Sequence, residues 1–198
     1  MLKNDLLELQ EEVINEQDEF AETLALIGVE GSGKSFIIEQ FGNSIGLDII
    51  ELIKDDFKNS STLLTALKTR MQEQGILFDE SKNRLNIPRV ILSVENLHLF
   101  TNKELELVKQ LRPMKNAKSL SGGAKVKNPN GILFISSTDI VDWAKMYNLE
   151  PYSRSEITQI IRRNVNGGTE EVRKFVSLSG RLNPKQSIEK MEEAINYA

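Results

Sequence analysis

The residues with the clearest capacity for chemistry lie between positions 28 and 35. This segment reads Gly-Val-Glu-Gly-Ser-Gly-Lys-Ser and fits G-x-x-x-x-G-K-[ST] at every fixed position. Its glycines let backbone amides converge on a phosphate group, and the start of a following helix adds further N–H donors. Lys34 would reach the outer phosphates and the Ser35 hydroxyl would hold Mg²⁺. The segment predicts a nucleoside triphosphate site with these contacts: Gly28, Val29, Glu30, Gly31, Ser32, Gly33, Lys34, Ser35 and Phe36.

Such a loop needs a partner carboxylate, which P-loop proteins place at the end of a neighbouring strand to hold the Mg²⁺ shell. Residues 89–94 form a short apolar run, and Glu95 and Asn96 follow it. Glu95 is the expected Mg²⁺ ligand. Asn96 accepts no proton, so it supplies none of the general-base assistance that contributes about 10²–10⁴-fold elsewhere. An alternative makes Glu95 the base and leaves Mg²⁺ to Ser35 and water.

Short apolar runs alternate with helical patterns up to about residue 150, as expected for a parallel sheet with helices on both faces. After Pro151 only helical patterns remain. The expected strands are 23–28, 48–53, 89–94 and 131–136, and the expected helices are 2–20, 34–43, 60–74, 101–111, 155–164, 169–178 and 184–197.

The predicted fold class is therefore α/β, a P-loop NTPase with a parallel sheet flanked by helices and followed by a small helical lid. We expect an acidic amphipathic helix within residues 1–22, an ATP-binding core over 23–150 and the lid over 151–198. The first helix is interpreted as a docked surface helix with a solvated acidic face, in preference to a hook for a partner.

Composition sets the broad class of protein. Of the 198 residues 39% are hydrophobic and 27% are charged, which is typical of a folded globular chain. Lys and Arg number 25 against 29 Asp and Glu, so overall charge cannot drive nucleic-acid binding. The absence of cysteine excludes disulfides and thiolate metal sites, and a single histidine argues against a zinc cluster. No apolar run approaches membrane length, so we expect a cytoplasmic protein without a membrane partner.

Three segments of this chain resemble the corresponding motifs of AAA+ ATPases. They are the phosphate loop, the expected strand followed by Glu95 and Asn96, and the Leu97–His98 pair after it. The closest resemblance is to the bacterial Holliday-junction branch-migration motors, and it covers about residues 20–198 without a winged-helix segment. That family carries Asp and Glu where Glu95 and Asn96 stand here; the Asp orders Mg²⁺ and the Glu polarises the attacking water. The resemblance implies ATP and Mg²⁺ as cofactors, and the two replacements imply weakened hydrolysis.

The resemblance also assigns residues that sense the γ-phosphate. The strand within 131–138 matches the AAA+ strand that ends in a polar sensor, which makes Ser137 or Thr138 the candidate. Lys185 stands where an arginine of the family's lid senses the same group, and lysine supplies charge without a planar fork. Residues 139–149 lack the arginine finger of the family, and Arg154 is the nearest substitute.

A basic stretch is local to this chain. No acid occurs from Leu107 to Thr138. In ring-forming AAA+ relatives this segment faces the central pore, so the resemblance implies contact with DNA phosphates; the alternative is an ordinary solvated loop. No aromatic residues interleave to stack on bases. The candidate DNA contacts are Lys109, Arg112, Lys115, Lys118, Lys125 and Lys127.

Two functions of different class follow from these observations. The first is an AAA+ ATPase that works in DNA replication or recombination as a motor, loader or remodeller, within a homo- or hetero-oligomer. The second is an ATP-gated adaptor or assembly subunit that binds nucleotide and hydrolyses it poorly, which Asn96 and the missing finger favour. A P-loop kinase is less consistent with the order of segments, because the helical lid follows the core instead of lying within it.

Overall fold

The chain divides into two compact units, one formed by residues 1–27 with 34–148 and the other by residues 28–33 with 149–198. The predicted boundary near residue 150 and the function of a helical lid stay predictions, because most of that segment lies outside the described residues. The computed structural model describes residues 2–15, 21–81, 84–113, 125–127, 131–153, 155–157 and 159–160.

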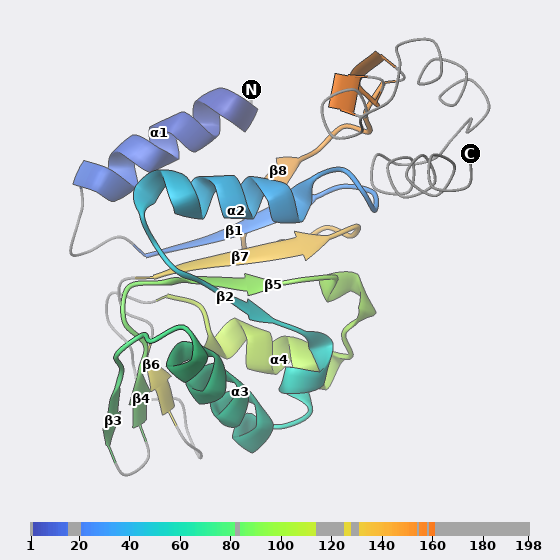
Figure 1. The fold of residues 1–198 in the computed structure, drawn as a ribbon. Helices are drawn as coiled ribbons and strands as arrows, with labels where there is room; N and C mark the ends of the chain where they lie inside the picture. Colours follow the sequence, from blue (N-terminus) through green and yellow to red (C-terminus); the bar gives the residue numbers. More distant parts are fainter. Residues whose placement is uncertain are drawn as a thin grey trace, which may run out of the picture. The chain divides into compact units, whose positions relative to one another are not determined.

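Within the described residues, a sheet of five strands forms the centre of the first unit, in the order β2-β5-β7-β1-β8. Every neighbouring pair in it is parallel. All the strands therefore end at one edge of the sheet, which we call the carboxyl edge (Figure 1). The strands are β1 (Glu22–Ile27), β2 (Ile49–Leu52), β5 (Ile91–Val94), β7 (Ile132–Ser137) and β8 (Lys145–Asn148).

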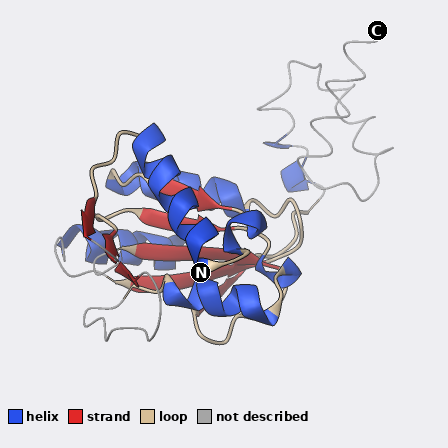
Figure 2. Ribbon diagram, turned by 90° about the horizontal axis from the view of Figure 1, so that it is seen from below, coloured by secondary structure: helices blue, strands red, loops and turns tan. Residues whose placement is uncertain are grey.

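Helices cover both faces of this sheet. Figure 1 shows α1 and α2 on one side and α3 and α4 on the other, and Figure 2 shows the same layering from below. The predicted α/β class with a parallel sheet and flanking helices is confirmed. The helices are α1 (Leu2–Asn15), α2 (Lys34–Ile45), α3 (Ser60–Glu73) and α4 (Asn102–Gln110), with short 3₁₀ helices η1 (Lys54–Phe57) and η2 (Leu97–Leu99).

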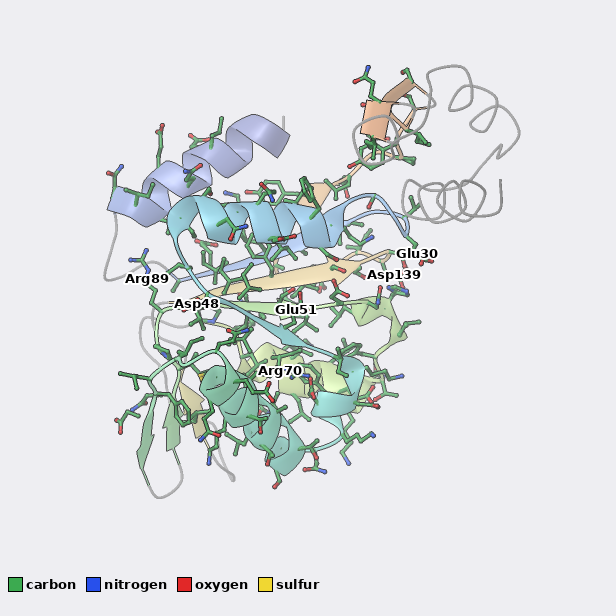
Figure 3. All side chains as sticks on the ribbon, in the orientation of Figure 1. Glu30, Asp48, Glu51, Arg70, Arg89 and Asp139 are labelled. Atoms are coloured by element: carbon green, nitrogen blue, oxygen red, sulfur yellow. The ribbon has the colours of Figure 1, made fainter. Side chains whose placement is uncertain are left out.

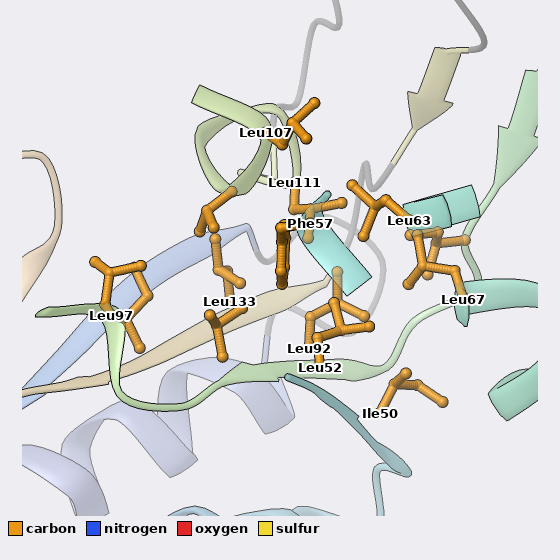
Figure 4. Close-up of a cluster of buried hydrophobic side chains, with 14 of the residues drawn as sticks. Ile50, Leu52, Phe57, Leu63, Leu67, Leu92, Leu97, Leu107, Leu111 and Leu133 are labelled. Atoms are coloured by element: carbon orange, nitrogen blue, oxygen red, sulfur yellow. The ribbon is translucent and has the colours of Figure 1, made fainter. Parts of the chain in front are cut away.

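The central strands are buried on both faces, as parallel strands between helical layers must be. Every residue of β5 and β7 is buried, which explains why both read as continuous apolar runs. The core between the sheet and α3 and α4 gathers around Phe57, whose ring lies 5.3 Å from that of Phe100 (Figure 4). This packing fixes the strand ends that carry the polar residues described below.

Two parts of the fold go beyond the sequence-based expectation. The edge strand β8 lies in a segment without an expected strand, because only Tyr147 of its four residues is buried. A second sheet in the order β3-β4-β6 is built from β3 (Asp79–Ser81), β4 (Arg84–Asn86) and β6 (Lys125–Lys127). Strands of three residues are too short to show a recognisable hydrophobic period.

Helix α4 begins at the capping box formed by Thr101 and Glu104. The Glu104 carboxylate accepts hydrogen bonds from the Thr101 backbone N–H (2.7 Å) and hydroxyl (2.9 Å). The backbone hydrogen bond favours the ionised form and lowers the pKa of Glu104 below its usual value. Along the described chain, no helix combines the length and the apolar character needed to cross a membrane.

The connection from β2 to α3 depends on a buried carboxylate. Asp56 Oδ2 accepts from the backbone N–H of Ile53 at 2.8 Å and from Arg70 Nη1 at 2.6 Å. Arg70 projects from α3 toward the end of β2 (Figure 3). The pair therefore joins α3 to the segment that leaves the carboxyl edge.

Replacing Asp56 by Ala should lower the free energy of unfolding by about 2 kcal/mol, because a guanidinium and a backbone N–H lose their acceptor. Asp55→Ala is the matched control, since Asp55 forms only an exposed pair with Lys58 at 3.2 Å and should cost less than about 0.5 kcal/mol. Urea unfolding followed by circular dichroism measures both changes. Equal losses in the two variants would contradict the assigned role of the Asp56–Arg70 pair.

Candidate nucleotide-binding site

The loop of residues 28–33 joins β1 to α2 and bends where its glycines allow it. Gly33 has φ +88°, a left-handed conformation that residues with a Cβ rarely adopt. A Cβ on Gly28 would lie 2.8 Å from Ser32 Oγ and 3.1 Å from the carbonyl oxygen of Leu149. The Ser32 N–H donates to the Val29 carbonyl at 3.2 Å and closes a tight turn. The backbone thus has the compact form that the spacing of the glycines predicts.

Ser35 and Glu95 meet at the carboxyl edge. Lys34 and Ser35 open helix α2 directly after the loop, and Glu95 directly follows β5. The Ser35 hydroxyl donates a hydrogen bond to Glu95 Oε1, across 60 positions of sequence. Lys34 is buried (9% exposed), whereas Ser35 is exposed. The two residues expected to hold Mg²⁺ are therefore in direct contact.

This pair fits a magnesium ion by its chemistry. A hydroxyl and a carboxylate are hard oxygen donors, and Mg²⁺ in nucleotide sites takes one or two protein ligands and completes its shell with water and phosphate oxygens. Glu95 is partly buried and its carboxylate is within reach of the N-terminal turn of α2. The arrangement is suited to bridge a protein carboxylate and a phosphate group through one cation.

Asn96 occupies a left-handed turn, with φ 55° and ψ 44°. It is the single non-glycine residue with positive φ in the part of the chain that the structure describes. Asparagine tolerates this conformation better than other residues with a Cβ, including glutamate. Its side chain is exposed. The backbone at this position therefore favours asparagine over a glutamate.

The predicted sensor residues lie at the end of β7 and are tied to the turn after Glu95. Ser137 is buried and its Oγ accepts from the Asp139 N–H at 3.0 Å. The Thr138 N–H donates to His98 Nδ1 at 3.4 Å, and the Thr138 hydroxyl donates to the Asp139 carboxylate at 3.1 Å. Figure 3 shows Asp139 at the carboxyl edge. His98 thus connects the segment after the Mg²⁺ candidate to the sensor segment.

Tyr152 is a further candidate contact residue beside the phosphate loop, and the sequence-based assignment did not include it. Its hydroxyl oxygen lies 2.7 Å from where a Cβ on Gly33 would stand, so only glycine admits this approach. Ser153 and Glu156 form a capping box just after it, with the Ser153 N–H donating to the Glu156 carboxylate at 2.8 Å. Hydrogen bonds from the Ser153 hydroxyl and backbone lower the pKa of Glu156. The spacing of Ser153 and Glu156 was the available signal, since it fixes the helix start beside Tyr152.

The remaining predicted nucleotide contacts differ in exposure. Val29 and Glu30 are exposed, and Phe36 is 63% exposed on the first turn of α2. Lys185 and Arg154, the proposed lid sensor and substitute finger, lie outside the described residues. The functional assignments made from the sequence for these residues stay predictions.

The predicted DNA contacts fall into three groups. Lys109 pairs with Glu106 at 2.8 Å, and the Arg112 guanidinium lies 5.6 Å from the centre of the Trp143 ring. Lys125 and Lys127 belong to β6. Lys115 and Lys118 are outside the described residues.

Comparison with solved structures identifies the fold. RuvB from Thermotoga maritima, titled a Holliday junction branch migration motor, matches 94% of this chain with a TM-score of 0.64 at 13% sequence identity. The chain therefore has the fold of these RuvB structures. Two single-residue variants of the same RuvB match with TM-scores of 0.65 at 14% and 13% identity.

The likeness to RuvB is one of fold at low identity. The match includes 93–94% of this chain, and this chain spans 58% of the length of the RuvB chains. No protein-family model and no curated protein sequence matches it. The predicted resemblance is therefore confirmed at the level of structure, while activity and partners do not follow from it.

Asn96→Glu should lower the free energy of unfolding by about 1 kcal/mol, because the left-handed backbone disfavours a longer side chain with a Cβ. Asn96→Gly should change it by less than about 0.5 kcal/mol, since glycine has no such penalty. Asn43→Glu, at an exposed position of helix α2, serves as the control for added charge. Urea unfolding measures all three; a destabilised glycine variant would refute the backbone argument.

His98 should exist as the tautomer with its proton on Nε2, because Nδ1 accepts from the Thr138 N–H. It is the one histidine of the chain, so its imidazole signals need no assignment. Long-range ¹H–¹⁵N NMR at alkaline pH reports the tautomer directly, with the urea-unfolded chain as reference. Indistinguishable tautomer ratios in the folded and unfolded chain would show that this contact is not kept in solution.

Proposed function

We propose that this protein binds ATP with Mg²⁺ and uses the nucleotide as a conformational switch. The observation that carries the proposal is the hydrogen bond from the Ser35 hydroxyl to the Glu95 carboxylate. It joins the residue after the G-x-x-x-x-G-K pattern to the acid after β5, which is separated from β1 in the sheet by β7 alone. A hydroxyl and a carboxylate in this arrangement are the pair that nucleotide-bound Mg²⁺ requires. Adenine is preferred to guanine on the resemblance to AAA+ proteins alone.

Each residue has a defined part in this proposal. The loop amides and Lys34 bind the phosphates, while Ser35 and Glu95 hold Mg²⁺, which neutralises the charge that develops during phosphoryl transfer. Ser137 and Thr138 detect whether a γ-phosphate is present. His98 transmits the position of the turn after Glu95 to Thr138 through its hydrogen bond. Lys185 supplies a cation from the C-terminal segment.

We extend the proposal to DNA as the substrate of this switch. RuvB is named as a branch migration motor of the Holliday junction, and the basic residues between Leu107 and Thr138 offer this chain phosphate contacts. The resulting function is work on DNA in replication or recombination, as a motor, loader or remodeller. The chain would do this work in an oligomer with copies of itself or with other subunits. A missing arginine finger would then be supplied by a partner.

Asn96 supports a second candidate function, an ATP-gated adaptor that hydrolyses ATP slowly. An asparagine in place of a general base removes proton acceptance, and its left-handed backbone disfavours a glutamate. In this alternative, binding of ATP assembles a complex of the adaptor with its partner. The slow hydrolysis of that ATP then lets the complex dissociate. The two candidates share the nucleotide site and differ in turnover.

ATP affinity and steady-state turnover separate these candidates. MgATP should bind the wild-type chain, and Lys34→Ala should weaken binding about tenfold or more because the phosphate charge loses its cation. Turnover is measured at two salt concentrations without DNA, with duplex DNA and with single-stranded DNA. Asn96→Glu should raise turnover about tenfold or more if a missing base limits it.

The outcomes discriminate clearly. DNA-stimulated turnover that falls with salt and vanishes in Lys34→Ala supports the motor. Tight ATP binding with negligible turnover under every condition rules out the motor and supports the adaptor. Failure of the wild-type chain to bind MgATP contradicts both.

A further inference from the structure

Helix α1 is held to the rest of its unit at its carboxyl-terminal end. Val13 is buried (2% exposed), and Arg89 Nη2 donates a hydrogen bond to the Val13 carbonyl at 2.7 Å. That carbonyl belongs to the last turn of α1, where backbone acceptors have no partner within the helix. Helix α1 also packs against α2, on the same side of the main sheet (Figure 1). One side of α1 is therefore occupied by the protein's own core.

Two large apolar side chains of α1 remain exposed in spite of this docking. Leu7 and Ile14 are each 48% exposed, and we call them the outer pair. Seven residues make almost two full turns of an α-helix, so the outer pair lies on one side of α1, about 10.5 Å apart along its axis. A seven-residue repeat is the spacing by which one helix packs along another. The outer pair thus has the spacing of a seam for a second helix.

Acidic residues border the outer pair. Glu8 and Glu11 are both exposed. Glu11 follows Leu7 by four residues and precedes Ile14 by three, so it is a neighbour of both on the helix surface. Residues 1–20 contain seven acids and one lysine. The sequence favoured a helix with a solvated acidic face, and the structure adds an apolar pair beside that acidic charge.

We propose that the outer pair and Glu11 form a docking face for a basic amphipathic helix of a partner protein. Such a helix covers Leu7 and Ile14 with its own apolar side chains and sets Lys or Arg beside Glu11. Opposite charges next to an apolar seam are the usual means by which paired helices choose their partner. This inference goes beyond the proposed function, because α1 contributes no residue to the candidate nucleotide site.

Charge makes a second copy of α1 a poorer occupant than a basic helix. Of the α1 side chains that the structure describes, the charged ones are Glu8 and Glu11. Two α1 helices packed through their outer pairs would border one seam with acids from both copies. Like charges beside a helix–helix seam oppose association, whereas Lys or Arg there favours it.

The test uses the full chain and two labelled synthetic peptides of about 21 residues, each with leucine at positions a and d of its heptads. The basic peptide carries lysine at positions e and g, and the acidic peptide carries glutamate there. Binding is followed by fluorescence anisotropy at low and high salt. The basic peptide should bind with a Kd of about 100 µM or tighter, and the acidic peptide about tenfold or more weakly, because its charges repel Glu11.

Substitutions on α1 locate the binding face. Leu7→Ser with Ile14→Ser should weaken binding of the basic peptide about tenfold or more, since both apolar contacts are lost. Glu11→Gln should weaken it about threefold at low salt and less at high salt, where the charge is screened. Glu11→Gln keeps the outer pair, so it tests the face even if the serine variant fails to fold.

The matched control is Leu77→Ser with Leu99→Ser, which removes two leucines that are 90% and 57% exposed elsewhere on the chain. This control should bind the basic peptide within about twofold of the wild-type chain. Equal losses in the control and in the α1 variant would overturn the inference. Absence of binding by the basic peptide, or equal binding of the two peptides, would overturn it as well.

Two further measurements separate the other possible outcomes. Light scattering reports self-association; if the wild-type chain forms dimers that Leu7→Ser with Ile14→Ser abolishes, the occupant is a second copy and the choice of partner is wrong. MgATP affinity of the α1 variants should equal that of the wild-type chain. Because peptide binding is measured without nucleotide, failure of the nucleotide site is distinguishable from failure of this face.

Discussion

Parallel pairing of the main strands is the constraint from which the candidate nucleotide site follows. Strand β1 leads through the phosphate loop into α2, and β5 leads into Glu95, so both deliver their polar residues at the carboxyl edge. Strand β7 lies between β1 and β5 in the sheet and ends in the sensor segment. The hydrogen bond from Ser35 to Glu95 forms because three strand ends converge there. An antiparallel partner in place of β5 would carry Glu95 to the other edge.

The turn after Glu95 links local backbone geometry to the chemistry proposed for the site. Asn96 adopts a left-handed conformation, and two residues later His98 accepts a hydrogen bond from Thr138. The same few residues therefore connect the Mg²⁺ candidate to the sensor segment. An asparagine at this turn is favourable for the backbone and unfavourable for proton abstraction. Under the proposed function, conformation and proton abstraction make opposite demands on this position, and the choice between motor and adaptor depends on which demand prevails.

The two ends of the main strands have different characters. The carboxyl edge brings together a hydroxyl, a carboxylate and sensor residues, which suits a cation and a triphosphate. Toward the amino-terminal ends, the small sheet pairs β4 with β6 and so joins segments about 40 residues apart in the chain (Figure 1). Strand β7 connects the two regions, since β6 precedes its first residue and Ser137 is its last.

The sequence by itself determined the phosphate loop, four of the five main strands and the helices around them. Those features depend on glycine spacing and on hydrophobic periodicity, which are local properties of the chain. Tertiary structure decided the rest: the edge strand β8, the small sheet, the Asp56–Arg70 pair and the contact of Arg112 with Trp143. Short strands have too few apolar residues to show a period, and pairing between distant side chains leaves no pattern in either partner. The left-handed turn at Asn96 belongs to the same group, because it follows from how β5 must join η2.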